Sequence, residues 1–308
     1  MVHLNQDLET DSCEEQKHRL MNSGKQLNLR DIQQLSLEIL LDVHEFCEKN
    51  GIVYSLAAGT LLGAVRHKGF IPWDDDVDVF MLRPEYEKFI ASYKSEKYKL
   101  LSMETDKDYF LSYAHVVDMD RTVIKYNYAP FYRKSCGLKI DIFPLDTVSD
   151  DRAEYDAQFD RTLEIGKYFY YARMAYWQFS LRKPFMYNYR LLKRKVKTLN
   201  GRAVFKYNRM VDANTRLLPF GSTGHVALMC LPLEQSRQLF CLKDFDDTVL
   251  LDFEGYKLKA MSGYDNVLRS AYGDYMQLPP EDQRHGVHDM VICWRTATGD
   301  KAENYPVK

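Results

Sequence analysis

The chain has 308 residues, of which 45% are hydrophobic, and contains 15 Gly and 10 Pro, a composition that excludes a disordered protein. Its net charge of −2 provides no overall attraction to nucleic acid or anionic lipid, so either contact would need a local patch. No run reaches the roughly 18 apolar residues that cross a bilayer, and the first residues lack the apolar core of a signal peptide. The six cysteines are scattered, with no Cys-x-x-Cys pair. We therefore expect a cytoplasmic protein with reduced thiols.

The first half of the chain is predicted to alternate helices and strands. Residues 1–27 are polar and aperiodic, so we expect a flexible N-terminal tail. Asn28 is suited to cap a helix that Gly51 ends, because apolar residues follow Asn28 at helical spacing. A strand is expected over 52–56. Pro84 is suited to the first turn of the next helix.

The pattern changes twice in the rest of the chain. Two β-rich runs, 111–117 and 122–126, flank a turn and predict a β-hairpin. From about Ala153 the apolar spacing is helical, and short strands return from about Gly224. A second hairpin is expected from 248–253 and 256–260, followed by a helix over 264–271. The predicted organisation is a catalytic core (28–150), a helical, basic and aromatic insertion (151–220) and a C-terminal segment that packs back on the core (221–308).

An acidic stretch carries the main chemical signal. Val77, Val79 and Met81 alternate with Asp76 and Asp78, and this period of two predicts a strand with both carboxylates on one face. Carboxylates held this close repel each other unless a cation neutralises them. Ligands that are all oxygen favour a hard ion, Mg²⁺ or, in its place, Mn²⁺.

A phosphate site is predicted directly before the acidic stretch. The Gly59-Thr60 turn precedes an apolar run over 61–65, and if that run is a short helix its free N–H groups can cradle a phosphate. Arg66, His67 and Lys68 follow, and could clamp a diphosphate or form an ordinary basic loop. We interpret the whole as a metal-assisted phosphoryl-transfer centre.

A calcium-binding loop is the main alternative for the acidic stretch. Asp74, Asp76, Asp78 and Glu85 match the ligand spacing of an EF-hand. Val79 stands where that loop needs a glycine, which argues against it. A solvated acidic turn without a ligand is the other alternative.

Three motifs together resemble the LicD family of the nucleotidyltransferase superfamily, to which fukutin-type ribitol-phosphate transferases are related. They are the stretch 59–78, the Asp-Ile-Phe-Pro run within 139–146, and Tyr-Gly-Asp-Tyr at 272–275 followed by Pro279-Pro280. The resemblance implies an α+β (α/β-like) fold: a nucleotidyltransferase-type mixed sheet flanked by helices, with a helical insertion. It also implies that phosphocholine or a similar phosphorylated alcohol moves from a CDP-alcohol donor to a hydroxyl of a cell-surface glycan or its lipid-linked precursor, with release of CMP.

The resemblance also assigns roles to particular residues. Asp141, in an apolar strand, would be the third carboxylate beside Asp76 and Asp78, acting as metal ligand or base; a buried salt bridge is its alternative. Asp146 is interpreted as a turn or cap residue. The other expected substrate-binding residues are Gly59, Thr60, Arg66, His67, Lys68, Arg284 and His288, the last two folding back over the site. His115 is expected to be a core histidine.

The segment 182–209 holds ten Lys or Arg and no acidic residue, interleaved with aromatics. It could bind RNA, lie on an anionic membrane, or be a solvated helix face. Because acceptors in the family are often lipid-linked, we favour peripheral contact with the inner face of the membrane and expect no nucleic-acid partner.

Two other functions stay open at this point. One is a nucleotidyltransferase that attaches NMP to an acceptor and releases pyrophosphate. The other is a non-catalytic scaffold, against which the intact set of carboxylates argues.

Overall fold

The structure, a computed structural model, describes residues 24–126, 137–173, 185–198, 202–231, 233, 237–286 and 290–295. Its centre is a mixed sheet in which β1 (Ser55–Leu56), β2 (Asp78–Leu82), β6 (Leu138–Val148), β4 (Ala114–Asp118) and β3 (Lys99–Leu101) lie side by side in that order. The β2–β6 pair is parallel and the others are antiparallel. β7 (His225–Ala227) pairs with the end of β6, and β8 (Leu239–Cys241) pairs with β7. Helices pack on this sheet, which confirms the α+β fold.

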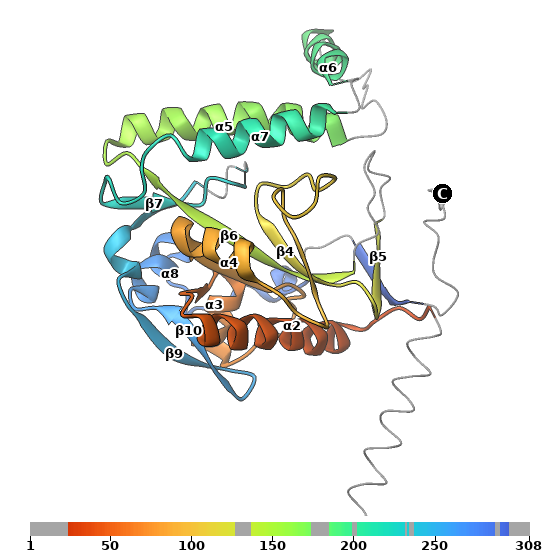
Figure 1. Cartoon of the computed structure of the whole chain (residues 1–308), viewed down its shortest axis with the longest axis vertical. Coiled ribbons are helices and arrows are strands. Elements are labelled where there is room, and N and C mark those ends of the chain that lie inside the picture. The colour runs from red at the N-terminus through yellow and green to blue at the C-terminus, as the bar shows by residue number, and fades with distance from the viewer. Residues whose placement is uncertain are drawn as a thin grey trace, which may run out of the picture.

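Two helices that pack on β6 begin where local signals predict (Figure 1). α2 (Leu29–Asn50) has a capping box, in which Asn28 Oδ1 accepts from Asp31 N at 2.9 Å, and it ends at Gly51, whose φ is +62°. Since a left-handed φ suits glycine, Gly51 ends this helix without strain. α4 (Arg83–Ser92) carries Pro84 in its first turn.

The predicted insertion contributes three described helices. α5 (Arg152–Arg173) and α7 (Ala203–Thr215) run antiparallel, joined by Gln158 Nε2, which donates to the Asn214 carbonyl at 2.7 Å. α6 (Phe185–Lys197) lies beyond this pair, on the side away from the sheet (Figure 1). Within the described part of the chain, no helix is long and apolar enough to cross a membrane.

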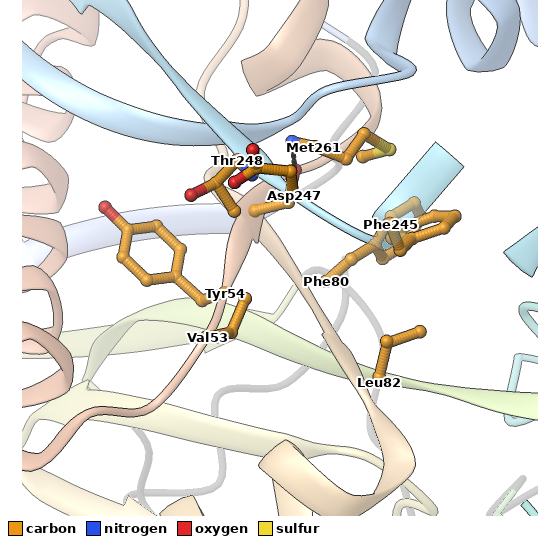
Figure 2. A pocket seen from close by; sticks show the side chains of 9 residues that line it. Val53, Tyr54, Phe80, Leu82, Phe245, Asp247, Thr248 and Met261 are labelled. Carbon is orange, nitrogen blue, oxygen red and sulfur yellow. Dashed lines mark hydrogen bonds between the residues drawn. The ribbon is translucent and has the colours of Figure 1, made fainter. Parts of the chain in front are cut away.

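The C-terminal part covers the β1 edge of the sheet. β9 (Thr248–Phe253) and β10 (Tyr256–Met261) form the expected hairpin, framed by the 3₁₀ turn η2 (Leu242–Phe245) and by α8 (Tyr264–Tyr272). Met261 N donates to Ser55 Oγ at 2.9 Å. A cavity of only about 20 Å³ remains at this seam, with Tyr54, Phe80 and Phe245 among its lining residues (Figure 2). The hairpin is thus packed closely against β1 and β2.

The first predicted hairpin is wrong. β5 (Thr122–Tyr126) pairs with β11 (Met290–Trp294), near the end of the chain, instead of with β4. β3 and β6 occupy both edges of β4, so no edge remains for β5. Next to β11, Leu27 N donates to the Ile292 carbonyl at 2.8 Å. The end of the predicted tail is therefore held against a strand. Residues 1–23 of that tail lie outside the described part of the chain.

Asp146 is not a turn or cap residue. It lies within β6, where its two carboxylate oxygens accept from Arg83 Nε and Nη2, each at 2.6 Å. The Arg83 side chain is only 7% exposed, and that of Asp146 only 4%. The pair holds the start of α4 to β6. The division of the chain into the four predicted segments stays a prediction.

Candidate active site

Asp78, Asp141 and His115 form one row across three neighbouring strands. In the parallel β2–β6 pair Asp78 is the register partner of Asp141, and in the antiparallel β4–β6 pair Asp141 is the partner of His115. Register partners on adjacent strands project to the same face, so the sheet itself brings the three side chains together. Asp76 lies just before β2 instead of within it, because the strand begins at Asp78.

The end of α3 next to this row is formed by Gly59 and Thr60. α3 (Ala58–His67) begins earlier than expected, so both residues lie in its first turn and not in a turn before it. Thr60 Oγ1 accepts from Asp78 N at 2.9 Å, which fixes the helix to the start of β2. A Cβ on Gly59 would lie 2.6 Å from Asp74 Oδ2, so glycine leaves room for that carboxylate. Ala58 has φ +43°, a strained value for a residue with a Cβ.

The two in-register carboxylates have opposite electrostatic environments. Burial, and then the nearby Asp76 and Asp141, raise the pKa of Asp78 well above its usual range. Burial acts on Asp141 in the same direction, but Lys139 and then His115 outweigh it and lower the pKa of Asp141. Lys139 Nζ contacts Asp141 Oδ1, and His115 Nε2 lies 3.1 Å from the same oxygen.

Sequence reasoning did not find these two partners of Asp141. Lys139 precedes Asp141 by two residues on the same strand, and that spacing, which places both on one face, could have indicated it. His115 is buried, as expected of a core histidine, but it lies against Asp141. Burial and then the charge of Lys139 lower the pKa of His115 to about 4, so its imidazole is neutral near pH 7.

The chemistry of the donor atoms fits a hard divalent ion. Asp76 and Asp78 offer oxygen atoms, and a bound cation would offset the burial and the neighbouring carboxylates that raise the pKa of Asp78. Among the described residues, however, no three His, Cys, Asp or Glu side chains converge closely enough to surround a metal. The calcium-loop alternative is not supported, because Glu85 accepts from Val53 N at 2.9 Å and β2 replaces the loop.

The predicted basic residues are divided between two tasks. Arg66 Nη1 donates to the Tyr275 carbonyl at 2.9 Å and so attaches α3 to the segment after α8. Lys68 ends α3 with φ +57°, and its carbonyl accepts from Glu254 N at 2.9 Å. Both residues therefore hold the backbone around α3.

Aromatic contacts bring the remaining predicted cations together around Trp73. The His67 ring meets the Trp73 ring edge-on at 6.4 Å, and burial lowers the pKa of His67. The Arg284 guanidinium lies 5.9 Å from the centre of the Trp73 ring. Arg284 follows the last 3₁₀ turn, η3 (Glu281–Gln283), so the late segment does fold back toward α3. His288 lies outside the described residues.

A cavity of about 180 Å³ opens beside Asp78. Its aromatic lining comes from Phe80, Phe143 and Tyr272, and Ala58 at the start of α3 also contributes. Burial and then Asp78, Asp74 and Asp76 raise the pKa of Tyr272 to about 12, which places its phenol near the carboxylates. Tyr272, the first residue of the motif at 272–275, thus lines the cavity, a role that the sequence did not indicate.

Comparison with known proteins identifies the family. Residues 51–184 match a family model described as LicD/FKTN/FKRP, nucleotidyltransferase domain. The lipopolysaccharide cholinephosphotransferase LicD of Haemophilus influenzae is 32% identical over 280 residues, which cover 86% of this chain and 97% of that protein. The chain belongs to the LicD family. It is accordingly an enzyme of the transferase class.

Two shorter matches are to proteins without an assigned function. An uncharacterized protein of Rickettsia typhi is 36% identical over 80 residues, 25% of this chain and 26% of that protein. Another, of Rickettsia prowazekii, is 48% identical over 48 residues, 16% of this chain and 18% of its own length.

Proposed function

We propose that this LicD-family enzyme transfers phosphocholine, or a similar phosphorylated alcohol, from a CDP-linked donor to a hydroxyl of a glycan or its lipid-linked precursor. The observation that carries the proposal is the in-register pair of Asp78 and Asp141 beside the N-terminal end of α3. Its chemical support is that a carboxylate pair suits a divalent ion while free helix N–H groups suit phosphate. The relative matched over nearly its full length is named as a cholinephosphotransferase.

Asp76, Asp78 and Asp141 are the residues that would hold Mg²⁺, or Mn²⁺ in its place. When bound, the ion would neutralise the donor diphosphate and the carboxylates together. The lowered pKa of Asp141 favours a permanently charged ligand over a general base, since a weak base accepts a proton poorly. Lys139 and His115 would then keep Asp141 ionised and oriented.

Phosphoryl transfer asks the protein mainly for position and charge. The acceptor hydroxyl oxygen would attack the phosphorus distal to cytidine, and the bond from that phosphorus to the bridging oxygen would break. The hydroxyl proton would pass to a base, and CMP would carry away the bridging oxygen. The N–H groups at the start of α3 would position the diphosphate next to the carboxylate row. Arg284, which lies over the Trp73 ring, would be a further cation.

The cavity beside Asp78 is suited to the alcohol end of the donor. Phe80, Phe143 and Tyr272 line it, and aromatic rings attract a quaternary ammonium group. Choline places its ammonium group only a few bonds from phosphorus, so one ligand could reach both the cavity and the carboxylate row. Of the phosphorylated alcohols considered, the cavity therefore favours phosphocholine.

The second candidate is a nucleotidyltransferase that attaches NMP to an acceptor and releases pyrophosphate. The description of the matching family model as a nucleotidyltransferase domain favours it. A non-catalytic scaffold is less consistent with the chain, because the carboxylates that a scaffold could lose are all present.

Product analysis tests the proposal. The full chain is incubated with Mg²⁺ and separately with CDP-choline, CDP-ethanolamine and a CDP-polyol, and slow hydrolysis to CMP is measured, which needs no knowledge of the acceptor. CMP formation that Asp78→Asn abolishes is the expected result. Pyrophosphate release from a nucleoside triphosphate, with no CMP from any CDP-alcohol, would replace the proposal with the second candidate.

A further inference from the structure

α6 presents an apolar stripe on its surface. Phe185, Tyr189, Leu192 and Val196 follow at intervals of four, three and four residues, the spacing of one helix face. Their exposed fractions are 79%, 49%, 37% and 54%. The ring planes of Phe185 and Tyr189 are inclined by 20° with centroids 6.4 Å apart, so the stripe begins with two neighbouring aromatic rings.

Another side of α6 contacts the protein. Leu191, which is off the stripe, is only 6% exposed. α6 packs against α5, and Lys197 Nζ lies 5.6 Å from the centre of the Tyr168 ring of α5. In Figure 1 α6 is farther from the central sheet than either α5 or α7. The apolar stripe is therefore directed away from the body of the enzyme.

Positive charge flanks the stripe. α6 holds five Lys or Arg and no acidic residue, and Lys193 is exposed beside the stripe. The segment 182–209 contains ten basic residues, whereas the rest of the chain has 32 Lys and Arg against 44 Asp and Glu. An anionic surface would thus attract this segment and repel the remainder of the chain. This uneven distribution of charge would orient the protein with α6 toward the surface.

We propose that α6 binds an anionic lipid surface, with its apolar stripe inserted between the headgroups and its cations on the lipid phosphates. A helix with an apolar face bordered by Lys and Arg has the composition of interfacial helices. Aliphatic Leu192 and Val196 favour acyl chains over nucleic-acid bases, which would need a stacking ring at each position. This inference does not depend on the proposed reaction.

Vesicle binding by the full chain tests it. We expect sedimentation with vesicles of phosphatidylglycerol and phosphatidylcholine, weak binding to phosphatidylcholine alone, and loss of affinity at high salt. Phe185→Ser with Leu192→Ser should lower affinity roughly tenfold or more. The matched control is Leu250→Ser with Tyr256→Ser, which removes two exposed apolar residues from the β9–β10 hairpin and should leave binding unchanged.

A second readout places the contact on the helix itself. Phe185→Trp should add a fluorescence signal that shifts to the blue only with anionic vesicles, because the ring enters a less polar environment. The proposal is overturned if the wild type does not bind anionic vesicles, or if the double variant binds as well as the control. Self-association that only the double variant loses, without vesicle binding, would reassign the stripe to a protein interface.

Discussion

Asp78 on β2 and Asp141 on β6 are register partners on parallel strands, yet the pKa of the first is raised and that of the second lowered. The difference arises because Lys139 and His115 contact Asp141. One carboxylate is therefore already compensated, while the other is buried beside negative neighbours. A cation bound here would gain most from Asp78 and Asp76.

Asp76→Asn and Asp78→Asn should each lower turnover by about a thousandfold or more, because a divalent ion contributes several kcal/mol of charge stabilisation. Circular dichroism should show an unchanged fold. The assay is CMP release from the preferred CDP-alcohol. If either variant keeps wild-type turnover, that residue has been assigned wrongly.

Mg²⁺ should stabilise the folded protein even without substrate. At 100 times its Kd an ion that binds only the native state adds roughly 2.7 kcal/mol, measurable as a rise in Tm. Asp78→Asn should remove the rise, while the exposed Asp120→Asn should keep it. A wild-type Tm that does not respond to Mg²⁺ or Mn²⁺ would contradict ion binding at these carboxylates in the absence of substrate.

In buffer that contains a chelator, the free energy of unfolding of His115→Gln should depend less on pH below about 6.5 than that of the wild type. The pKa of His115 falls from 6.5 in the unfolded chain to about 4 in the folded protein. The stability that this neutral, buried ring contributes is complete above pH 6.5 and is lost as the pH falls toward 4, by about 3 kcal/mol in total. The contribution of Asp141, with its lowered pKa, begins to decline below about pH 5 in both proteins, so it does not account for a difference between them at higher pH.

Denaturant unfolding of His115→Gln across pH 4–7 checks this prediction. His285→Gln, at an exposed position, is the matched control and should follow the wild type. A parallel decline in wild type and His115→Gln would show that His115 does not titrate as its burial indicates.

Arg83→Ala should cost about 3–5 kcal/mol of stability, because it leaves the buried Asp146 carboxylate without its two short hydrogen bonds. Lys88→Ala, which removes an exposed pair with Glu85, should cost less than about 1 kcal/mol. Urea unfolding measures both. Arg83→Met with Asp146→Leu should recover much of the loss, since an apolar pair replaces both charges; no recovery would mean that the ion pair itself is needed.

Gly59→Ala should impair catalysis more than folding. The new Cβ would displace the Asp74 carboxylate from the start of α3, and a shift of this size can cost roughly 10–100-fold in kcat/KM. Gly51→Ala is the contrasting control. Because Gly51 has a left-handed φ, the substitution should cost about 1 kcal/mol of stability, and it should leave kcat/KM unchanged because Gly51 is not part of the site. Equal effects of the two variants on kcat/KM would remove Gly59 from the site.

The sequence by itself determined the elements whose signals are local. The capping box at Asn28, the αL residue Gly51, Pro84 at the start of α4, and the hairpin around 254–255 are each specified within a few residues. The same reasoning singled out Asp141, because an Asp in an apolar strand is conspicuous, and its role stays a prediction.

Only the tertiary structure decided which of these elements meet. β5 pairs with β11 and not with its neighbour β4, and Asp146 meets Arg83 across 63 positions. The contact of His115 with Asp141 depends on strand register, and a shift of one residue would turn either side chain to the other face. Periodicity indicates on which face of its own strand a residue lies. Strand order and register depend instead on which strand edges pair with one another in the whole chain, and a local sequence pattern carries no information about those pairings.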